Sequence, residues 1–146
     1  MGKKETGGAK KADPAAAVQD SIISSTLARI KYKIFVMSGK GGVGKSSVAV
    51  NLAAALAGRG FKVGIMDVDI HGPSIPGMLG LEGQRVFYDG TSIVPMEYTV
   101  NLVVMSIDFL LQDRGEAVIW RGPMKYGVIR QFISDVEWGE LDFLIV

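Results

Sequence analysis

The densest group of chemically capable residues is Gly39-Lys40-Gly41-Gly42-Val43-Gly44-Lys45-Ser46, where closely spaced glycines meet two lysines and a serine. This stretch fits the pattern G-x-x-x-x-G-K-[ST] in full, which is typical of a loop that binds the phosphates of a nucleotide. Glycines let successive backbone N–H groups converge on one anion, and the positive end of a following helix adds to the attraction. The sequence therefore predicts a phosphate-binding site in the first third of the chain.

Two side chains at the end of this loop are expected to bind the phosphates and an accompanying metal ion. Lys45 would reach the β- and γ-phosphates, and the Ser46 hydroxyl would bind Mg²⁺. The predicted nucleotide contacts are Gly39, Lys40, Gly41, Gly42, Val43, Gly44, Lys45, Ser46 and Ser47.

Two carboxylates, Asp67 and Asp69, follow the apolar segment at residues 62–66. Ligand-contacting groups in open α/β sheets gather at the carboxyl ends of the strands, so both would lie near the phosphates. We expect Asp67 to belong to the metal site by holding a Mg²⁺-bound water, and Asp69 to be catalytic by positioning or activating the attacking water. The alternative is that one of them caps a turn or a short helix. His71 is interpreted as a loop residue and not as a catalyst.

The segments around the loop are those needed to position these groups. A strand is predicted at about residues 33–38, a helix at 47–57 that ends near Gly58 and Gly60, and a second strand at 62–66. A strand, a helical crossover and another apolar strand form a βαβ unit, which indicates a parallel sheet.

The second half of the chain supplies further core elements. We expect a hairpin at residues 86–94 with an Asp-Gly turn, a strand at 102–107, a short helix or loop at 109–114, a helix at 123–136 and a strand at 141–146. The predicted buried stripe of the later helix is Met124, Val128, Ile129, Phe132 and Ile133. Asp142 lies at the amino end of the last strand, roughly 13 Å from its tip at about 3.3 Å per residue, which is too far for a metal ligand.

The amino-terminal region is expected to be an appendage. Residues 1–12 are polar, small and basic, which favours disorder. Asp13 and Pro14 then form a helix start signal, so a helix is predicted at residues 13–30, with Val18, Ile22 and Leu27 as its apolar stripe.

Composition excludes several classes of protein. A length of 146 residues suits one domain, and a net charge of +1 gives no bulk attraction to nucleic acid. The chain has no cysteine, which excludes disulfides and thiolate metal ligands. No apolar run reaches the roughly 18 residues of a membrane span, and no secretory signal is recognisable. We therefore expect a cytoplasmic protein that binds neither nucleic acid nor membrane.

Three segments together resemble the Mrp/ApbC/Nbp branch of the MinD-like ATPases. They are the loop with its additional Lys40, the segment D-V-D-I-H-G-P-S-I-P at residues 67–76, and W-R-G-P-M at residues 120–124. The resemblance runs from about Ile30 to the end of the chain. It implies a three-layer α/β/α phosphate-loop NTPase that binds ATP and Mg²⁺, hydrolyses ATP slowly and transfers iron–sulfur clusters to apo-proteins. It also implies a homodimer in which Lys40 is catalytic by reaching the partner's nucleotide. Lys45 and Asp69 complete the expected catalytic residues.

The resemblance also indicates what the chain lacks. In the family, a Mg²⁺-binding carboxylate would come directly after Val146, and cluster-binding cysteines follow later. We therefore expect residues 31–146 to be the amino-terminal part of an ATPase domain, truncated before its sheet is complete and without turnover alone. Two alternatives stay open: a MinD/ParA-like spatial regulator, or a nucleotide-binding fragment without catalysis. The preference for ATP over GTP rests on the resemblance alone.

Overall fold

The computed structural model describes residues 13–39, 44–70, 72–111 and 124–146. At its centre lies a five-stranded sheet with the strand order β1-β7-β2-β6-β5. The strands are β1 (Ile30–Ile34), β7 (Leu141–Ile145), β2 (Val63–Asp67), β6 (Leu102–Ser106) and β5 (Met96–Thr99). The first four in this order run parallel, and β5 is antiparallel to β6.

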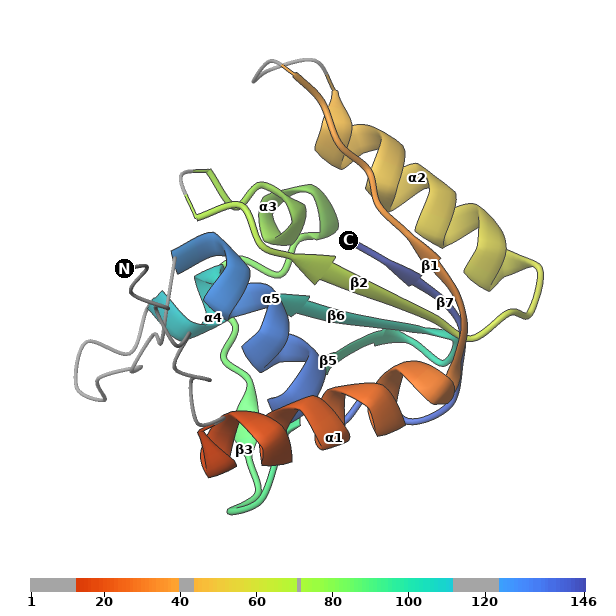
Figure 1. Cartoon of the computed structure of the whole chain (residues 1–146). Coiled ribbons are helices and arrows are strands. Elements are labelled where there is room, and N and C mark those ends of the chain that lie inside the picture. The colour runs from red at the N-terminus through yellow and green to blue at the C-terminus, as the bar shows by residue number, and fades with distance from the viewer. Residues whose placement is uncertain (1–12, 40–43, 71, 112–123) are drawn as a thin grey trace, which may run out of the picture.

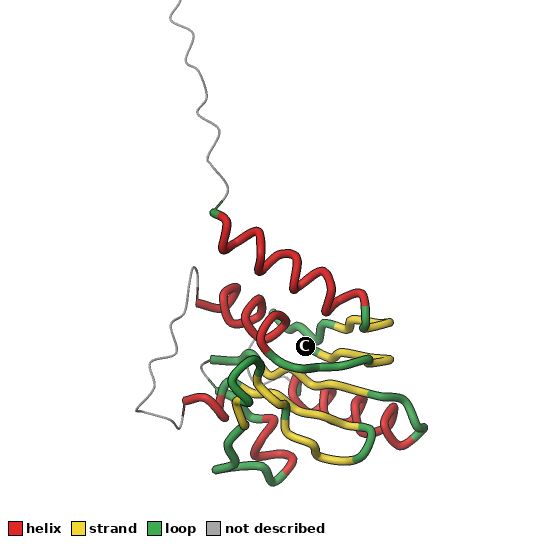
Figure 2. Tube along the Cα trace, turned by 90° about the horizontal axis from the view of Figure 1, so that it is seen from below, coloured by secondary structure: helices red, strands yellow, loops and turns green. Residues whose placement is uncertain are grey.

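Helices cover both faces of the sheet, which confirms the predicted three-layer α/β/α arrangement (Figure 1). Figure 2 shows α2 (Lys45–Gly58) and α3 (Ile75–Leu79) on one face, with α1 (Pro14–Ala28) and α5 (Met124–Asp135) together on the other. α4 (Asp108–Leu111) is a single turn after β6. The predicted hairpin is confirmed and consists of β3 (Phe87–Tyr88) and β4 (Ile93–Val94).

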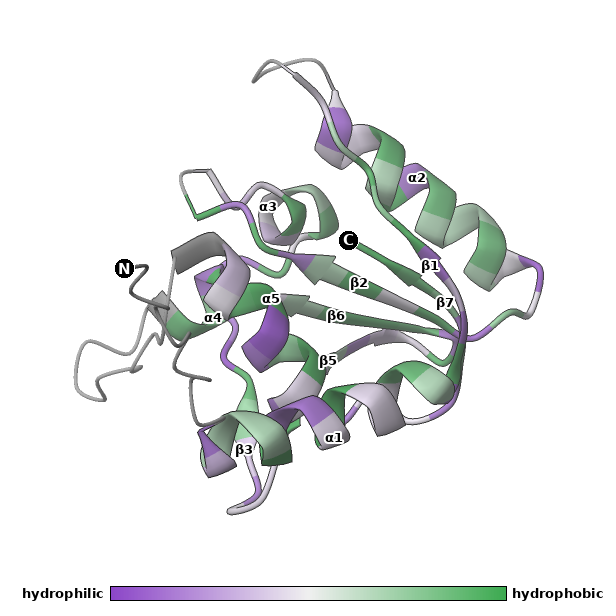
Figure 3. Cartoon of the chain, in the orientation of Figure 1, coloured by the Kyte–Doolittle hydropathy of each residue, from purple (hydrophilic) through white to green (hydrophobic). Residues whose placement is uncertain are grey.

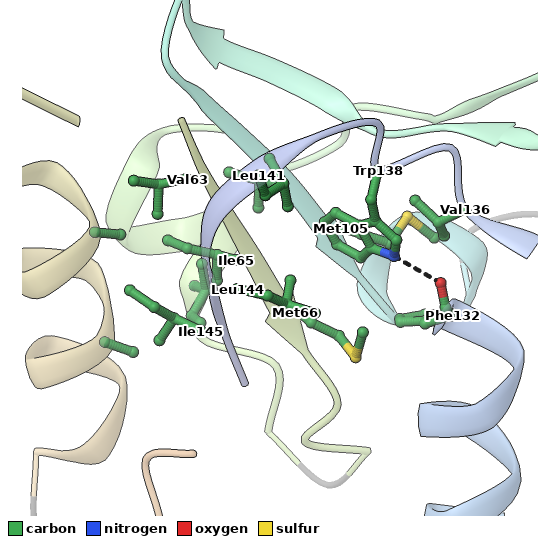
Figure 4. Packing of buried hydrophobic residues seen from close by; sticks show 14 of the residues in the cluster. Val63, Ile65, Met66, Met105, Phe132, Val136, Trp138, Leu141, Leu144 and Ile145 are labelled. Atoms are coloured by element: carbon green, nitrogen blue, oxygen red, sulfur yellow. Dashed lines mark hydrogen bonds between the residues drawn. The ribbon is translucent and has the colours of Figure 1, made fainter. Parts of the chain in front are cut away.

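The core lies along the central strands β7 and β2. Every residue of β2 is buried, and strands covered on both faces read as continuous apolar runs. Figure 3 shows the apolar residues concentrated on these strands and on the helix surfaces that face them. In Figure 4 the side chains of β2 and β7 pack with Phe132 of α5 and with Trp138, whose indole Nε1 donates a 2.9 Å hydrogen bond to the Phe132 carbonyl.

Gly64 lets the central strands meet this indole closely. A Cβ atom at this position would lie 2.8 Å from Leu141 Cδ1 and 3.0 Å from the Trp138 ring. Both neighbours are buried, so a larger residue would displace packed side chains. The glycine is therefore required by close packing, and its φ is not in the left-handed region.

α2 lies close to the sheet because small side chains line its inner face. Ala49, Ala53 and Ala57 recur at a spacing of four residues, which places them on one side of the helix, and all three are buried. The helix begins at Lys45, two residues earlier than predicted. The last residues of the phosphate loop are thus its first helical turn.

The predicted apolar stripe of α1 is wrong for Val18 and Ile22 and confirmed for Leu27, which packs against the core. Val18 and Ile22 are 61% and 44% exposed. The face turned toward the domain instead carries Gln19, Ile23, Thr26 and Leu27, which follow helical spacing one position away. Polar contacts with α5 fix this orientation, including the ion pair between Asp20 and Arg130. The predicted Asp13 cap is confirmed by a 3.0 Å bond from the Ala15 N–H.

The first strand also differs from the prediction. β1 occupies Ile30–Ile34 because it pairs with β7 from Ile30↔Leu141 to Ile34↔Ile145. Residues 35–38 lead toward the phosphate loop without regular secondary structure, and the Val36 N–H donates a 2.8 Å bond to the Val146 carbonyl. The strand was predicted to start at residue 33 because the apolar run begins there. The more polar residues before it pair with β7 at the edge of the sheet, and the prediction missed them.

Other elements follow the sequence more closely. β6 and β7 lie within the predicted strands, and α5 buries Val128, Phe132 and Ile133 as expected. The predicted tail at residues 1–12 and the segment at 120–123 lie outside the described residues.

Candidate functional site

A cavity of about 600 Å³ opens at the carboxyl ends of β1, β7 and β2, beside the first turn of α2. Parallel α/β sheets bind ligands at this edge, and the volume is in the range of small-molecule sites. Its lining residues are Phe35, Val36, Met37, Ser38, Gly39, Lys45, Ser46, Ala49, Met66, Asp67, Val68, Asp69, Ile75, Ile129 and Val146.

The phosphate loop enters this cavity from both of its described ends. Gly39 lines the wall after β1, and Gly44 precedes α2 with φ of +84°, a left-handed conformation that favours glycine. No side chain in the described residues caps the α2 amino terminus. The N–H groups of its first turn are therefore available to an anion. Lys40, Gly41, Gly42 and Val43 lie outside the described residues.

Lys45 and Asp69, both expected to act in catalysis, lie next to each other. Lys45 Nζ is 3.8 Å from Asp69 Oδ2, and each side chain is 37% exposed. The ammonium group therefore already faces an anion within the cavity. A phosphate oxygen at this position would compete with the carboxylate for the same cation.

Ser46, the expected metal ligand, is also paired. The hydroxyl of Ser74 donates a hydrogen bond to the Ser46 oxygen, with 2.6 Å between the two Oγ atoms. Ser47 is exposed in the first turn of α2 and does not line the cavity. Ser74 was not predicted from the sequence, although its place directly before Ile75-Pro76 is typical of a residue at a helix start.

Asp67 lies in the cavity wall and is almost completely buried, with 5% exposure. Its Oδ1 accepts from the Asp69 N–H at 3.2 Å. Its Oδ2 accepts from the Ile75 N–H and the Ser106 hydroxyl, both at 3.3 Å. Burial raises the pKa of Asp67, and these hydrogen bonds oppose that rise. The Asp67 carboxylate thus ties the segment after β2 to the sheet, as the turn-capping alternative predicted. It also lines the cavity.

The donor set is suited to a hard cation. Ser46, Ser74 and Asp67 offer only oxygen atoms, which Mg²⁺ prefers. Within the described ranges no cluster of three His, Cys, Asp or Glu residues could hold a metal ion. A magnesium ion here would therefore need oxygen atoms from the nucleotide and from water as well.

Asp142 is placed far from the cavity, as expected. Its Oδ2 accepts from the Lys62 N–H at 2.8 Å and its Oδ1 from Lys31 Nζ at 2.9 Å. These two contacts hold the pKa of Asp142 below its ordinary value. Asp142 therefore joins the amino ends of β1, β7 and β2 and is not part of the site.

Sequence comparison finds relatives of this chain among P-loop NTPases and iron–sulfur cluster proteins. The family ParA, described as NUBPL iron-transfer P-loop NTPase, matches residues 29–146. An iron-sulfur cluster carrier protein from Methanococcus maripaludis is 53% identical over 128 residues, which is 88% of this chain and 44% of the relative. The cytosolic Fe-S cluster assembly factor CFD1 of Saccharomyces cerevisiae is 50% identical over 127 residues, or 84% of this chain and 43% of that protein.

A solved structure is also similar. The nucleotide-binding protein from Archaeoglobus fulgidus, in complex with ADP and with cobalt found by PIXE, has a TM-score of 0.72 and 43% identity. The match covers 86% of this chain and 47% of that chain. The chain thus spans slightly less than half the length of these relatives. In the described part of the chain, no helix has the length and apolar character needed to cross a membrane.

Proposed function

Because the chain belongs to the ParA family of NUBPL-type iron-transfer P-loop NTPases, we propose that it binds Mg·ATP and forms the phosphate-binding half of an iron–sulfur cluster carrier ATPase. The main support is the meeting of Lys45, Ser46, Asp67 and Asp69 in one cavity at the amino end of α2. This arrangement joins a cation, uncapped N–H groups and oxygen ligands around the space that a triphosphate would fill.

Binding begins with exchange of partners inside the cavity. The N–H groups of the first turn of α2 donate hydrogen bonds to the phosphate oxygens. Lys45 leaves Asp69, 3.8 Å away, for the β- and γ-phosphates, where it stabilises charge that develops as the bond to the γ-phosphate breaks. Ser46, together with a water held by Asp67, would hold Mg²⁺, whose positive charge would offset part of the charge on the phosphates.

Hydrolysis uses the carboxylate that this exchange releases. Asp69 then orients a water molecule for attack on the γ-phosphorus and accepts its proton as ADP and phosphate separate. Asp67 keeps the segment after β2 in place through its bonds to Asp69 and Ile75, and its carboxylate would help to hold Mg²⁺ through a water. Lys40 supplies a second cation from the partner of a homodimer.

The remaining parts of the activity belong to the whole protein. The chain contains no cysteine, so it offers no thiolate for an iron–sulfur cluster, which is the cargo and not a cofactor of these residues. We assign cluster transfer to apo-proteins, in the cytoplasm, to a homodimer of the whole protein. The names of the relatives and the match to a family of iron-transfer P-loop NTPases support cluster transfer, and the homodimer rests on the family resemblance described above.

A titration with Mg·ATP tests the proposal. Lys45→Ala should weaken binding at least about tenfold, because a charged hydrogen bond of roughly 1.5–3 kcal/mol is lost. Lys62→Ala removes the same charge at the opposite end of β2 and serves as the matched control, with unchanged affinity. Equal affinity of the Lys45→Ala variant and the wild-type chain would refute the proposed site.

A further inference from the structure

The hydroxyl groups of Ser46 and Ser74 come from two different elements and meet beside the cavity, which Ser46 lines. Ser46 lies in the first turn of α2, and Ser74 directly precedes α3. Their oxygen atoms are 2.6 Å apart. The segment carrying Ser74 is separated from the phosphate loop by 28 positions in sequence, so this contact is a product of the fold.

The position of Ser74 is fixed by buried groups. The next residue, Ile75, is 5% exposed, and its N–H donates to Asp67 Oδ2 at 3.3 Å. Asp67 is in turn held by the Ser106 hydroxyl on β6. The backbone beside Ser74 is thus held to the sheet by a series of buried hydrogen bonds. The side chain of Ser74 itself is exposed and accessible to a ligand.

The spacing of the two oxygens suits neighbouring ligands of one small cation. Mg²⁺ binds oxygen at about 2.0–2.1 Å in octahedral geometry, which places adjacent ligands roughly 2.9 Å apart. The observed pair would have to separate by only a few tenths of an ångström. Both oxygens are neutral hydroxyls, which leaves the charge balance to the phosphates of the nucleotide.

On the basis of the proposed function, we propose that Ser74 is a second hydroxyl ligand of the magnesium ion that enters with the nucleotide. The hydrogen bond to Ser46 is then exchanged for two bonds to the metal. Because Ser74 precedes α3, and α3 packs against α2, metal binding would join α2 and α3 directly. The occupancy of the nucleotide site would be transmitted to the segment after β2 in this way.

Metal specificity tests this assignment, because the chain contains no native cysteine. In Ser74→Cys a thiolate replaces the hydroxyl, and soft ligands favour soft metals. We expect Cd²⁺ to replace Mg²⁺ in the ADP complex with a preference at least about tenfold above the wild-type value, and to produce an ultraviolet cadmium–thiolate band only when ADP is present. Ser24→Cys, on the exposed surface of α1, controls for binding to any single thiol.

Two further variants separate a ligand from a hydrogen-bond partner. Ser74→Ala should weaken Mn²⁺ binding to the ADP complex at least about tenfold, whereas Ser74→Thr, which keeps the hydroxyl, should restore it. Unchanged or tighter Mn²⁺ binding in Ser74→Ala, or no ADP-dependent cadmium band in Ser74→Cys, overturns the assignment while leaving the nucleotide site intact. A wild-type chain that binds no nucleotide overturns the proposed function and the assignment together.

Discussion

The competition between Asp69 and phosphate for Lys45 gives a prediction with an unusual sign. Asp69→Asn removes the carboxylate that faces the ammonium group at 3.8 Å. Although Asp69 is proposed to be catalytic, its loss should tighten nucleotide binding, because Lys45 no longer has to leave an anion and one repulsive charge near the phosphates is gone. Hydrolysis by the whole protein should fall in the same variant.

The structure limits the size of this effect. At 3.8 Å two unit charges attract by about 1 kcal/mol in bulk water. Both side chains are 37% exposed, and pairs at the surface contribute about 0.2–1 kcal/mol. We therefore expect Asp69→Asn to lower the dissociation constant by at most about fivefold. Screening should shrink the difference as salt is added.

Calorimetric titration with Mg·ATP at two salt concentrations measures this effect. Asp20→Asn is the matched control, since it also neutralises one aspartate and breaks an ion pair, that with Arg130 on the far side of the sheet. This control should bind like the wild-type chain. Weaker binding by Asp69→Asn, on the scale expected for Lys45→Ala, would show that Asp69 supports the phosphate and does not compete with it.

Three further predictions concern the scaffold. Gly64→Ala should lower the free energy of unfolding by about 1–2 kcal/mol, because overpacking against Leu141 and Trp138 outweighs the stabilisation that comes from a less flexible unfolded chain. A urea titration showing equal or higher stability would contradict the close approach of these side chains to Gly64. Phe132→Ala should cost about 3–5 kcal/mol in the same assay, since the ring is fully buried, and a loss below about 1 kcal/mol would count against the packing described. The pKa of Asp142 lies below its ordinary value of 3.8 when the chain is folded. The ionised carboxylate therefore stabilises the fold above pH 3.8, and this stabilisation is lost as the pH falls through the folded pKa. Asp142→Asn should be less stable than the wild-type chain at pH 7, by a margin that shrinks in acid, and a constant margin would argue against the contacts with Lys62 and Lys31.

The phosphate loop and the surrounding βαβ unit could be predicted because their signals are local. Glycine spacing, Lys45 and Ser46 are neighbours in sequence, and the apolar runs of β2 and β7 reflect burial on both faces. Asp67, the last residue of β2, and Asp69 could be placed at the cavity by topology alone, because parallel strands bring their carboxyl ends to one edge. The roles proposed for Lys40, Lys45 and Asp69 are predictions that await the experiments above.

The features that sequence reasoning missed depend on tertiary contacts. Ser74 reaches Ser46 only because Asp67 fixes the intervening segment, and no periodicity signals this. The buried face of α1 is set by polar partners on α5, so an apolar stripe was a poor guide. The bounds of β1 follow its pairing with β7 and not its own apolar residues.

A crystal structure of the chain grown with Mg·ADP tests the central claim most directly. We predict phosphate density against the N–H groups at the start of α2, with Lys45 Nζ turned from Asp69 toward it. An ordered, correctly folded chain with this cavity empty, or with the nucleotide bound elsewhere, would contradict the account.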